Sequence, residues 1–242
     1  MQIDTNFKRL LSEDRLYGYT TRYAQSIDLD PIKIYKWNVA LAESLYPLLE
    51  IVEVGLRNSI NEAVAEHYAD PDWLLDSQIL SVKEHAKVQE SREKYQAKYN
   101  KEPKIGKIIS DLNLGFWVSL LDKRYDNKLW HQIIRQTFPF MPKNIRDRKH
   151  ASLRFSKIRA LRNRVFHFEP IWHWKDLLQQ HDEIVEAIKW IDPALQDLVQ
   201  IERFNEVYSM GPMASGISKD NGYAVVLATQ EESELSTTME YA

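Results

Sequence analysis

The sequence contains no cysteine, which excludes disulfide bonds and thiolate metal sites. It also has no long apolar run, because its most apolar stretches, such as residues 112–121, are too short and too polar to span a bilayer. Residues 1–11 do not resemble a signal peptide. These absences predict a protein without membrane spans and are compatible with a reducing cytoplasm. At 242 residues, 44% of them apolar, the chain is long enough for one domain with its own core and a tail.

The familiar signatures of cofactor and metal enzymes are also missing. There is no glycine-rich phosphate-binding loop, no dinucleotide-binding fingerprint, no H-E-x-x-H and no C-x-x-C. His167, Glu169 and His173 lie close together in the sequence, but their spacing crosses Pro170 and matches no helical arrangement of metal ligands. We therefore expect neither a metal nor a cofactor.

Apolar residues recur at helical spacing through most of the chain, and this predicts an all-α helical bundle. The bundle is expected to be built around two helices, 31–67 and 151–168. Pro47 should kink the first of these or split it in two. Peripheral helices are predicted over 12–24, 81–99, 105–121 with an interruption at Gly115, 125–137, 177–191 and 193–208. The domain is expected to span residues 1–208, followed by a mobile acidic tail, 209–242, with at most a brief strand over 223–227.

Charge is distributed unevenly along the chain. The net charge is −3, but residues 209–242 hold one lysine against five acidic residues, so the other 208 residues carry a net charge of +1. Within these, residues 143–164 contain nine lysines or arginines and one aspartate. Such a basic segment is expected of a protein that binds a polyanion, although a solvated helix face would have the same composition.

The basic segment ends with an arginine, an amide and a histidine within six residues: Arg162, Asn163 and His167. In a helix, Asn163 and His167 share a face, whereas Arg162 points about 140° away from His167. Pro170 lacks an N–H and clashes with the carbonyl four residues before it, so the backbone over 166–169 should unwind or stop. Such a break would free His167 to swing toward Arg162, or toward the same residues of a second copy.

An arginine and a titratable histidine beside an amide suit metal-free RNA cleavage. The imidazole of His167 can move a proton to or from the ribose 2′-OH or the leaving oxygen. Arg162 can hold the charge that builds on the phosphate, and Asn163 would orient the phosphate or the histidine. The alternative is structural: His167 would be buried against a backbone carbonyl, and an arginine would pair with Glu169 across the bend.

The segment L-R-N-R-V-F-H-F-E-P-I-W, residues 161–172, resembles the R-x4-H signature of HEPN-superfamily ribonucleases, in the form found in the Abi-like (abortive infection) family. The resemblance spans roughly residues 12–200. Other stretches similar to that family follow in its order: Trp37-Asn38, Glu53 to Asn58, Gly115-Phe116-Trp117 with Ser119-Leu120, and Trp130 with Phe138-Pro139. One departure is Phe168, where many relatives would have a second histidine.

The resemblance implies a metal-independent RNA endonuclease of an abortive-infection or toxin–antitoxin system, with RNA as substrate and a protein or RNA antitoxin as a further partner. It also implies a homodimer whose two R-x4-H motifs face each other in one composite cleft. His167 would be the general acid or base, and Arg162 would stabilise the phosphate. The small face of Ser156, Ala160, Asn163 and His167 would allow close approach of two helices. Attack by the 2′-OH would leave a 2′,3′-cyclic phosphate and a 5′-hydroxyl.

Two further sets of residues would serve this site. Glu53 and Arg57 are four positions apart, in the order that favours an ion pair, and would brace the site from a neighbouring helix; otherwise they form a surface pair of little value. Glu169 is expected to support the site from beyond the bend. RNA contacts are predicted for Arg154, Lys157, Arg159 and Arg164.

Two other interpretations remain open. A non-catalytic RNA-binding or antitoxin-binding helical module would need the basic segment but not His167. A purely structural protein would use Arg162 and His167 to pin the bend at Pro170, and loss of His167 would then lower the melting temperature by several degrees. Trp172 and Trp174 are the aromatic pair to test for base stacking.

Overall fold

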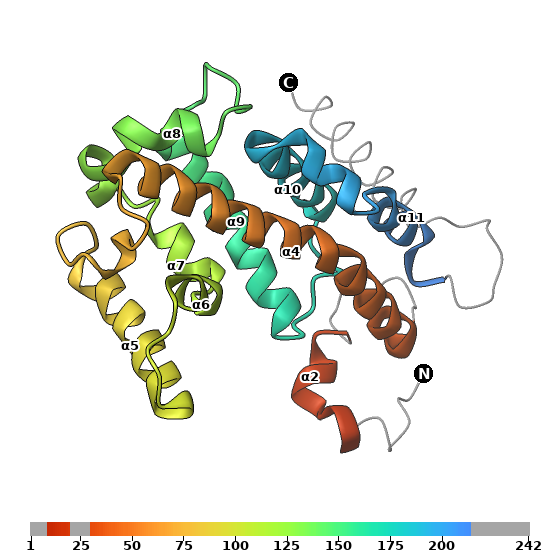
Figure 1. Cartoon of the computed structure of the whole chain (residues 1–242). Coiled ribbons are helices and arrows are strands. Elements are labelled where there is room, and N and C mark those ends of the chain that lie inside the picture. The colour runs from red at the N-terminus through yellow and green to blue at the C-terminus, as the bar shows by residue number, and fades with distance from the viewer. Residues whose placement is uncertain (1–8, 20–29, 214–242) are drawn as a thin grey trace, which may run out of the picture. The chain divides into compact units, whose positions relative to one another are not determined.

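The computed structural model describes residues 9–19 and 30–213, and every regular element in these ranges is a helix (Figure 1), which confirms the predicted all-α fold. The α-helices that lie wholly within them are α2 (Glu13–Tyr17), α4 (Pro31–Tyr68), α5 (Val82–Tyr99), α6 (Ile105–Asp111), α7 (Leu114–Ser119), α8 (His131–Thr137), α9 (Arg148–Phe166), α10 (Leu177–Ile191) and α11 (Glu202–Met210). None of the helices described is long and apolar enough to cross a membrane. The first helix, predicted over 12–24, ends earlier than expected, at Tyr17, with Gly18 as its C-cap. The tail beyond residue 213 and the strand over 223–227 lie outside the described ranges.

The chain divides into two compact units. Unit 1 comprises residues up to Tyr46, Asn163–His181 and residues from Gln200 onward, and unit 2 comprises Pro47–Arg162 and Asp182–Val199. Helices α4, α9 and α10 each contribute residues to both units.

Helix α4 is the longest element and agrees with the helix predicted over 31–67. It begins with Pro31, whose missing N–H is not needed because the first N–H groups of a helix have no partner within it. The Asp30 carboxylate caps this end by accepting from the N–H of Ile32 at 2.9 Å. Pro47 lies inside the helix without splitting it, and the boundary between the two units falls there.

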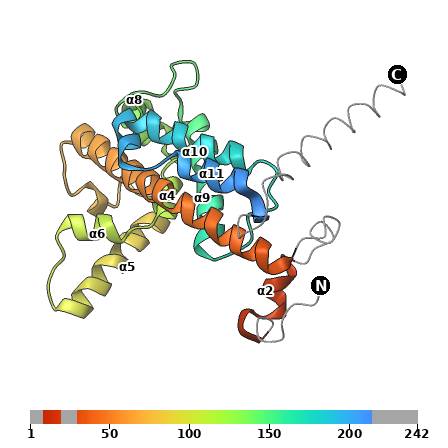
Figure 2. The same cartoon turned by 90° about the vertical axis from the view of Figure 1, so that its right-hand side faces the viewer.

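Unit 1 is held together by buried side chains that bond to the backbone of other segments. Trp37 on α4 donates from Nε1 to the carbonyl of Val207 at 2.9 Å, so α4 and α11 lie side by side (Figure 2). The buried carboxamide oxygen of Asn38 accepts from the N–H groups of Ile171 and Trp172 at 2.7 and 3.1 Å. The segment that follows α9 is thereby fixed against α4.

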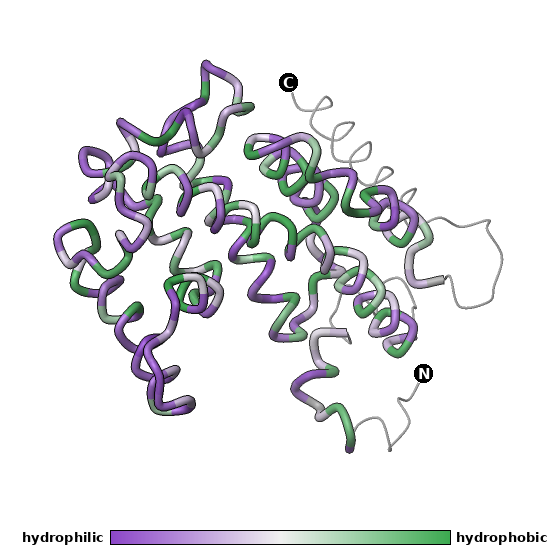
Figure 3. The backbone as a smooth tube through the Cα atoms, viewed as in Figure 1, coloured by the Kyte–Doolittle hydropathy of each residue, from purple (hydrophilic) through white to green (hydrophobic). Residues whose placement is uncertain are grey.

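Unit 2 has an aromatic core and a charged outer helix. The rings of Trp130, Phe138 and Phe155 stack in series, with centroid distances of 6.0 and 5.4 Å. Helix α5 lies beside α6 and is hydrophilic along most of its length (Figure 3). Only three of its side chains are buried, in agreement with the prediction of a charged helix that is solvated on most sides.

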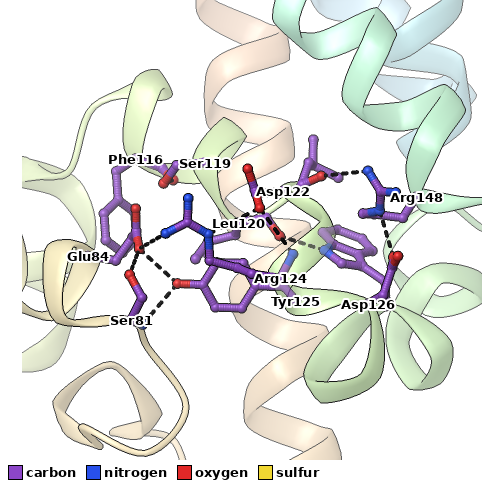
Figure 4. A network of polar contacts seen from close by, with 12 residues as sticks. Ser81, Glu84, Phe116, Ser119, Leu120, Asp122, Arg124, Tyr125, Asp126 and Arg148 are labelled. Carbon is purple, nitrogen blue, oxygen red and sulfur yellow. Dashed lines mark hydrogen bonds and ion pairs between the residues drawn. The ribbon is translucent and has the colours of Figure 1, made fainter.

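The buried carboxylate of Glu84 anchors the start of α5 (Figure 4). Ser81 precedes the helix and Glu84 is its third residue, which is the spacing of a capping box. The Ser81 hydroxyl donates to Glu84, while its N–H donates to the Tyr125 hydroxyl at 3.0 Å. That hydroxyl donates in turn to Glu84 at 2.9 Å, and the Arg124 guanidinium lies 3.9 Å from the same carboxylate.

These contacts keep Glu84 ionised. Burial by itself would raise its pKa, but the hydrogen bonds from Ser81 and Tyr125, with the charge of Arg124, outweigh burial and hold the pKa below its usual value. Burial raises the pKa of Tyr125, so its hydroxyl stays protonated and remains a donor. The sequence analysis did not identify this network.

Capping side chains explain the predicted boundaries that were wrong. The interruption expected at Gly115 lies earlier, because the side chain of Asn113 caps α7. The basic helix begins three residues earlier than expected, since Asp147 accepts a hydrogen bond from its first turn. The last predicted helix, 193–208, begins at Pro193 as predicted, with Asp192 as its cap, but it is divided into a 3₁₀ turn, Pro193–Leu198, and α11.

Candidate functional site

The residues predicted to form the site fall in both units. Helix α9 crosses from unit 2 to unit 1 between Arg162 and Asn163. The members in unit 2 are Glu53, Arg57, Arg154, Lys157, Arg159 and Arg162. Those in unit 1 are Asn163, Arg164, His167 and Glu169.

In unit 2, Arg162 is held by Glu53. The Arg162 Nε donates to the Glu53 carboxylate at 3.2 Å, and the two side chains are only 24% and 20% exposed. The other carboxylate oxygen of Glu53 accepts from the N–H of Leu114, the first residue of α7, at 2.9 Å. Glu53 therefore joins α4, α7 and α9 and fixes the direction of the Arg162 side chain.

The predicted ion pair between Glu53 and Arg57 is not formed. The Arg57 Nε donates instead to the side chain of the neighbouring Asn58 at 3.3 Å. A pair along one helix surface gains little in water, whereas Arg162 meets Glu53 in a half-buried place where a backbone N–H also bonds to the carboxylate. Glu53 thus contacts Arg162 directly, and Arg57 takes no part in this contact.

In unit 1, α9 ends in a Schellman motif rather than an unwound segment. The N–H of Phe168 donates to the carbonyl of Val165 at 3.1 Å, and the N–H of Glu169 donates to that of Arg164 at 2.9 Å. Phe168 occupies the left-handed position of the motif, with φ of 58°. Pro170 follows, where the helix has already ended.

His167 stays in the helical register of α9. Its N–H donates to the carbonyl of Asn163 at 2.9 Å, the bond of a regular α-helix. The prediction that Pro170 would free His167 to swing toward Arg162 is therefore wrong, because the Schellman bonds satisfy the last carbonyls without unwinding. In a regular helix the two side chains remain about 140° apart around the axis.

The side chains of Asn163 and His167 form an exposed polar pair on the last turn of α9. Ala160, on the same face, is exposed as well. The imidazole makes no hydrogen bond or ion pair with any described residue, so it can exchange a proton with a bound molecule. The exposure of His167 contradicts the buried histidine of the structural alternative, whereas the other half of that alternative, an arginine paired with Glu169, is present as Arg164.

His167 lines a cleft of about 870 Å³ that lies within unit 1. Its charged lining consists of the cations Arg15, Arg164 and Lys175 and the carboxylates Asp14 and Glu169, and two histidines, His167 and His173, also line it. Much of the remaining lining is aromatic. A cleft of this volume with a few polar groups can hold a ligand the size of a nucleotide.

Arg164 forms part of the wall of this cleft. Its guanidinium lies over the ring of Trp174, 5.1 Å from the centroid, and its Nε is 3.2 Å from the Glu169 carboxylate. Glu169 thus pairs with Arg164. His173 is exposed, but partial desolvation by the groups around it lowers its pKa, and the positive charge of Arg164 lowers it further. His173 is therefore neutral at neutral pH and can accept a proton.

Trp172 and Trp174 do not provide the two free rings that base stacking would need. Trp172 is buried and donates from Nε1 to the carbonyl of Gly18 at 3.2 Å. One face of Trp174 is covered by Arg164. The ring next to the motif that remains exposed is that of Phe168, at 72%.

The first part of the basic segment packs against α10 in unit 2. Arg154 donates to the Glu183 carbonyl at 3.0 Å and to the Glu186 carboxylate at 2.6 Å, and its guanidinium lies 4.6 Å from the centroid of Trp190. Its side chain is only 17% exposed and already has these partners, which disfavours the predicted contact with RNA. Lys157 is 58% exposed but pairs with Glu183 at 3.2 Å.

Arg159 differs from these two residues. It is exposed and has no hydrogen-bond or ion-pair partner within the described ranges. It therefore remains a predicted RNA contact, together with Lys157 and with Arg164 in the cleft.

Arg154 and Arg159 offer a matched pair of variants. Arg154→Met should destabilise the protein by about 2 kcal/mol, because Glu186 would lose a charged hydrogen-bond partner, with no change in the salt dependence of RNA binding. Arg159→Met should leave stability unchanged and reduce the slope of log K against log salt by about one phosphate contact. Thermal melting and RNA titrations at several salt concentrations measure both. Equal effects of the two substitutions on the salt slope would contradict the assignment.

Among the described residues, no group of histidine, aspartate and glutamate side chains could hold a metal ion, and this includes His167, Glu169 and His173.

No family model, curated protein or solved structure matches the chain. The likeness to HEPN ribonucleases therefore stays a prediction from the sequence. The sequence analysis missed three members of the cleft, Arg15, His173 and Lys175. His173 and Lys175 follow the motif closely and alternate with Trp172 and Trp174, but no sequence pattern connects the motif with Arg15.

Proposed function

We propose that the protein is a metal-independent RNA endonuclease in which His167 transfers a proton. The observation that carries this proposal is the position of His167. Its side chain is exposed, shares an intact helical turn with Asn163, and lines a cleft together with three cations. An imidazole so placed can act on a bound phosphodiester.

In the proposed reaction, the ribose 2′-oxygen attacks the adjacent phosphorus and the bond from phosphorus to the 5′-oxygen breaks. The 2′-OH loses a proton and the leaving oxygen gains one, and the products are a 2′,3′-cyclic phosphate and a 5′-hydroxyl. His167 performs one of these transfers. His173, neutral beside Arg164, is a second group of the cleft that can accept a proton. Arg164 and Lys175 would neutralise the RNA phosphates.

Arg162 has a separate role in this proposal. It stabilises the charge on the reacting phosphate, as the resemblance to R-x4-H ribonucleases implies. Because α9 keeps Arg162 and His167 on different sides of its axis, a second copy of the chain would bring the two together at one phosphate. The exposed small face of α9, with Ala160 and Asn163, suits such close approach. A defence role in the cytoplasm, with a protein or RNA antitoxin, also rests on the resemblance.

Cleavage of RNA by the purified protein in excess EDTA tests the proposal. We expect cleavage to persist in EDTA and the products to carry a 2′,3′-cyclic phosphate and a 5′-hydroxyl, because the 2′-oxygen is the nucleophile. Mass spectrometry of the product ends measures this. Products with a 5′-phosphate, or cleavage abolished by EDTA, would rule out this mechanism.

A further inference from the structure

Phe168 combines two features that the fold does not explain. It adopts φ of 58°, in the left-handed region that favours glycine or asparagine and disfavours bulky side chains. Its ring is nevertheless 72% exposed, so burial in unit 1 does not compensate for the backbone strain. Glycine would satisfy the Schellman motif without strain or an exposed aromatic ring. Residues held in such conformations at clefts often serve a function.

The backbone around Phe168 is held from more than one side. The Schellman hydrogen bonds on both sides of it close the end of α9. Arg15 on α2 donates from its guanidinium to the Phe168 carbonyl at 3.2 Å. The ring is thus carried by a fixed backbone at the cleft that His167 also lines. A fixed, exposed aromatic ring binds at a lower entropic cost than a flexible one.

We propose that Phe168 is a base-stacking residue that receives an unpaired nucleobase of the RNA beside the reacting phosphate. The inference rests on the proposed function and names its substrate class, single-stranded RNA with an unstacked base next to the cleaved bond. Phe168 is adjacent to His167 in sequence and lines the same cleft as Arg15, Arg164 and Lys175. A base stacked on Phe168 and the phosphate that His167 acts on would therefore belong to the same nucleotide. Every base presents a face that can stack on a ring, so the residue selects for unpaired RNA rather than for one base.

The cations in the cleft favour a nucleic acid over an apolar protein segment as the ligand of this ring. Three positively charged side chains line the cleft together with Phe168, against two carboxylates, Asp14 and Glu169, so cations are in excess. A protein partner would be expected to match an exposed phenylalanine with apolar surface, whereas RNA brings an aromatic base and a phosphate together.

The test is a double-mutant cycle in which the Phe168 ring and one base of the RNA are removed singly and together. The RNA is a short single strand with 2′-O-methyl sugars, which cannot be cut by 2′-oxygen attack, and an abasic residue is placed at each position in turn. The proteins are full-length wild type, Phe168→Gly and Phe168→Tyr. Phe168→Gly removes the ring and relaxes the backbone, and it should not lower the melting temperature. Phe168→Tyr keeps a ring in the same position.

For wild type and Phe168→Tyr, we expect one abasic position to lower RNA affinity by roughly ten- to hundredfold. For Phe168→Gly, affinity for intact RNA should fall by a similar factor, and the same abasic position should cost less than about twofold, since the stacking partner is already absent. Fluorescence anisotropy measures all affinities. An equal abasic penalty in Phe168→Gly and wild type would overturn the inference, and so would a wild type that does not bind RNA.

Binding and cleavage separate this inference from the proposed function. One outcome is that RNA binds with the expected coupling between ring and base, while RNA with 2′-OH groups is not cut. That result would contradict the proposed nuclease function and support the base-stacking site. RNA that is cut without any coupling would remove the base site alone. Light scattering on Phe168→Gly completes the test, because a change in its oligomeric mass with unchanged RNA binding would assign the ring to a protein contact and overturn the proposal.

Discussion

Replacing His167 with alanine should lower the rate of RNA cleavage by about 10²- to 10⁴-fold, the contribution expected of a proton-transfer group. The side chain is exposed and has no hydrogen-bond partner within the described ranges, so the melting temperature should change by no more than about 2 °C. RNA affinity should change little, since nothing in the proposed role uses the imidazole to hold the substrate. Single-turnover cleavage in EDTA, RNA titration and thermal melting measure these three quantities.

His150 is the matched control for this substitution. It is an exposed histidine on the first turn of the same helix, and its Nδ1 lies 2.6 Å from the Asp147 carboxylate. His150→Ala should leave cleavage within about twofold of wild type, because a surface substitution away from the cleft has little effect. Cleavage at the wild-type rate by His167→Ala would end its catalytic assignment. A fall of several degrees in melting temperature without an RNA phenotype would favour the structural interpretation.

Substitution of Arg162 tests the catalytic proposal less clearly than substitution of His167. Its removal takes the partner from Glu53, a carboxylate that is 20% exposed and also bound by the N–H of Leu114. A loss of activity in Arg162→Ala would therefore mix a catalytic effect with local rearrangement around α7. The exposed imidazole carries no such structural contact in the described ranges, and for that reason the proposal is tested first on His167.

The elements of the fold were predictable because their signals are local. Apolar spacing identified the helices of the bundle, and Asp30-Pro31 marked the start of α4 correctly. The boundaries that were wrong depend on capping by Asn113 and Asp147. These side chains were visible in the sequence, but many asparagines and aspartates in loops do not cap helices. Where a helix begins or ends depends both on its apolar periodicity and on whether a nearby side chain caps it. A single sequence does not show which of the two decides the boundary.

The choice of ion-pair partners could not be predicted, because it depends on which helices meet. Glu53 had a plausible partner four residues away and instead pairs with Arg162, 109 residues away in sequence. The same applies to Arg154, whose charge suggested RNA and whose neighbours on α10 are acidic. Sequence analysis counted the cations of the basic segment correctly, but their availability to RNA depends on tertiary contacts.

The candidate site also combines features that the sequence predicted with features that it did not. The motif residues Asn163 and His167 were found from helical spacing, and their exposure on one turn agrees with it. The stop of α9 before Pro170 was one of the two expected outcomes, and the helix ends at Phe166 in hydrogen-bonded turns instead of unwinding. The helix ends without unwinding because Phe168 takes the left-handed conformation that closes it. No sequence rule assigns a phenylalanine to that position, since glycine and asparagine are the usual residues there.

Replacing Glu84 with alanine should have the largest effect on stability, a loss of about 2–4 kcal/mol in the free energy of unfolding. The side chain is 1% exposed and accepts hydrogen bonds from Ser81 and Tyr125. Without it, the Tyr125 hydroxyl keeps a buried donor with no acceptor, and the start of α5 loses its anchor. Arg124 adds less, because it is half-exposed and 3.9 Å away. The melting temperature should fall by about 5–15 °C, and calorimetry measures it.

The charge of Glu84 can be separated from its shape by Glu84→Gln, studied as a function of pH. Because the pKa of Glu84 in the folded protein lies below its usual value of 4.5, the stabilisation from its ionised form is fully present above pH 4.5 and is lost as the pH falls through the folded pKa. The difference in stability between wild type and Glu84→Gln should therefore be largest near neutral pH and shrink on acidification. Tyr125→Phe keeps the carboxylate and should lower the free energy of unfolding near neutral pH by less than Glu84→Gln does. A difference between wild type and Glu84→Gln that stays constant from pH 7 to pH 3 would show that folding does not shift the pKa of Glu84, and a difference that grows on acidification would show that Glu84 is buried without its charge.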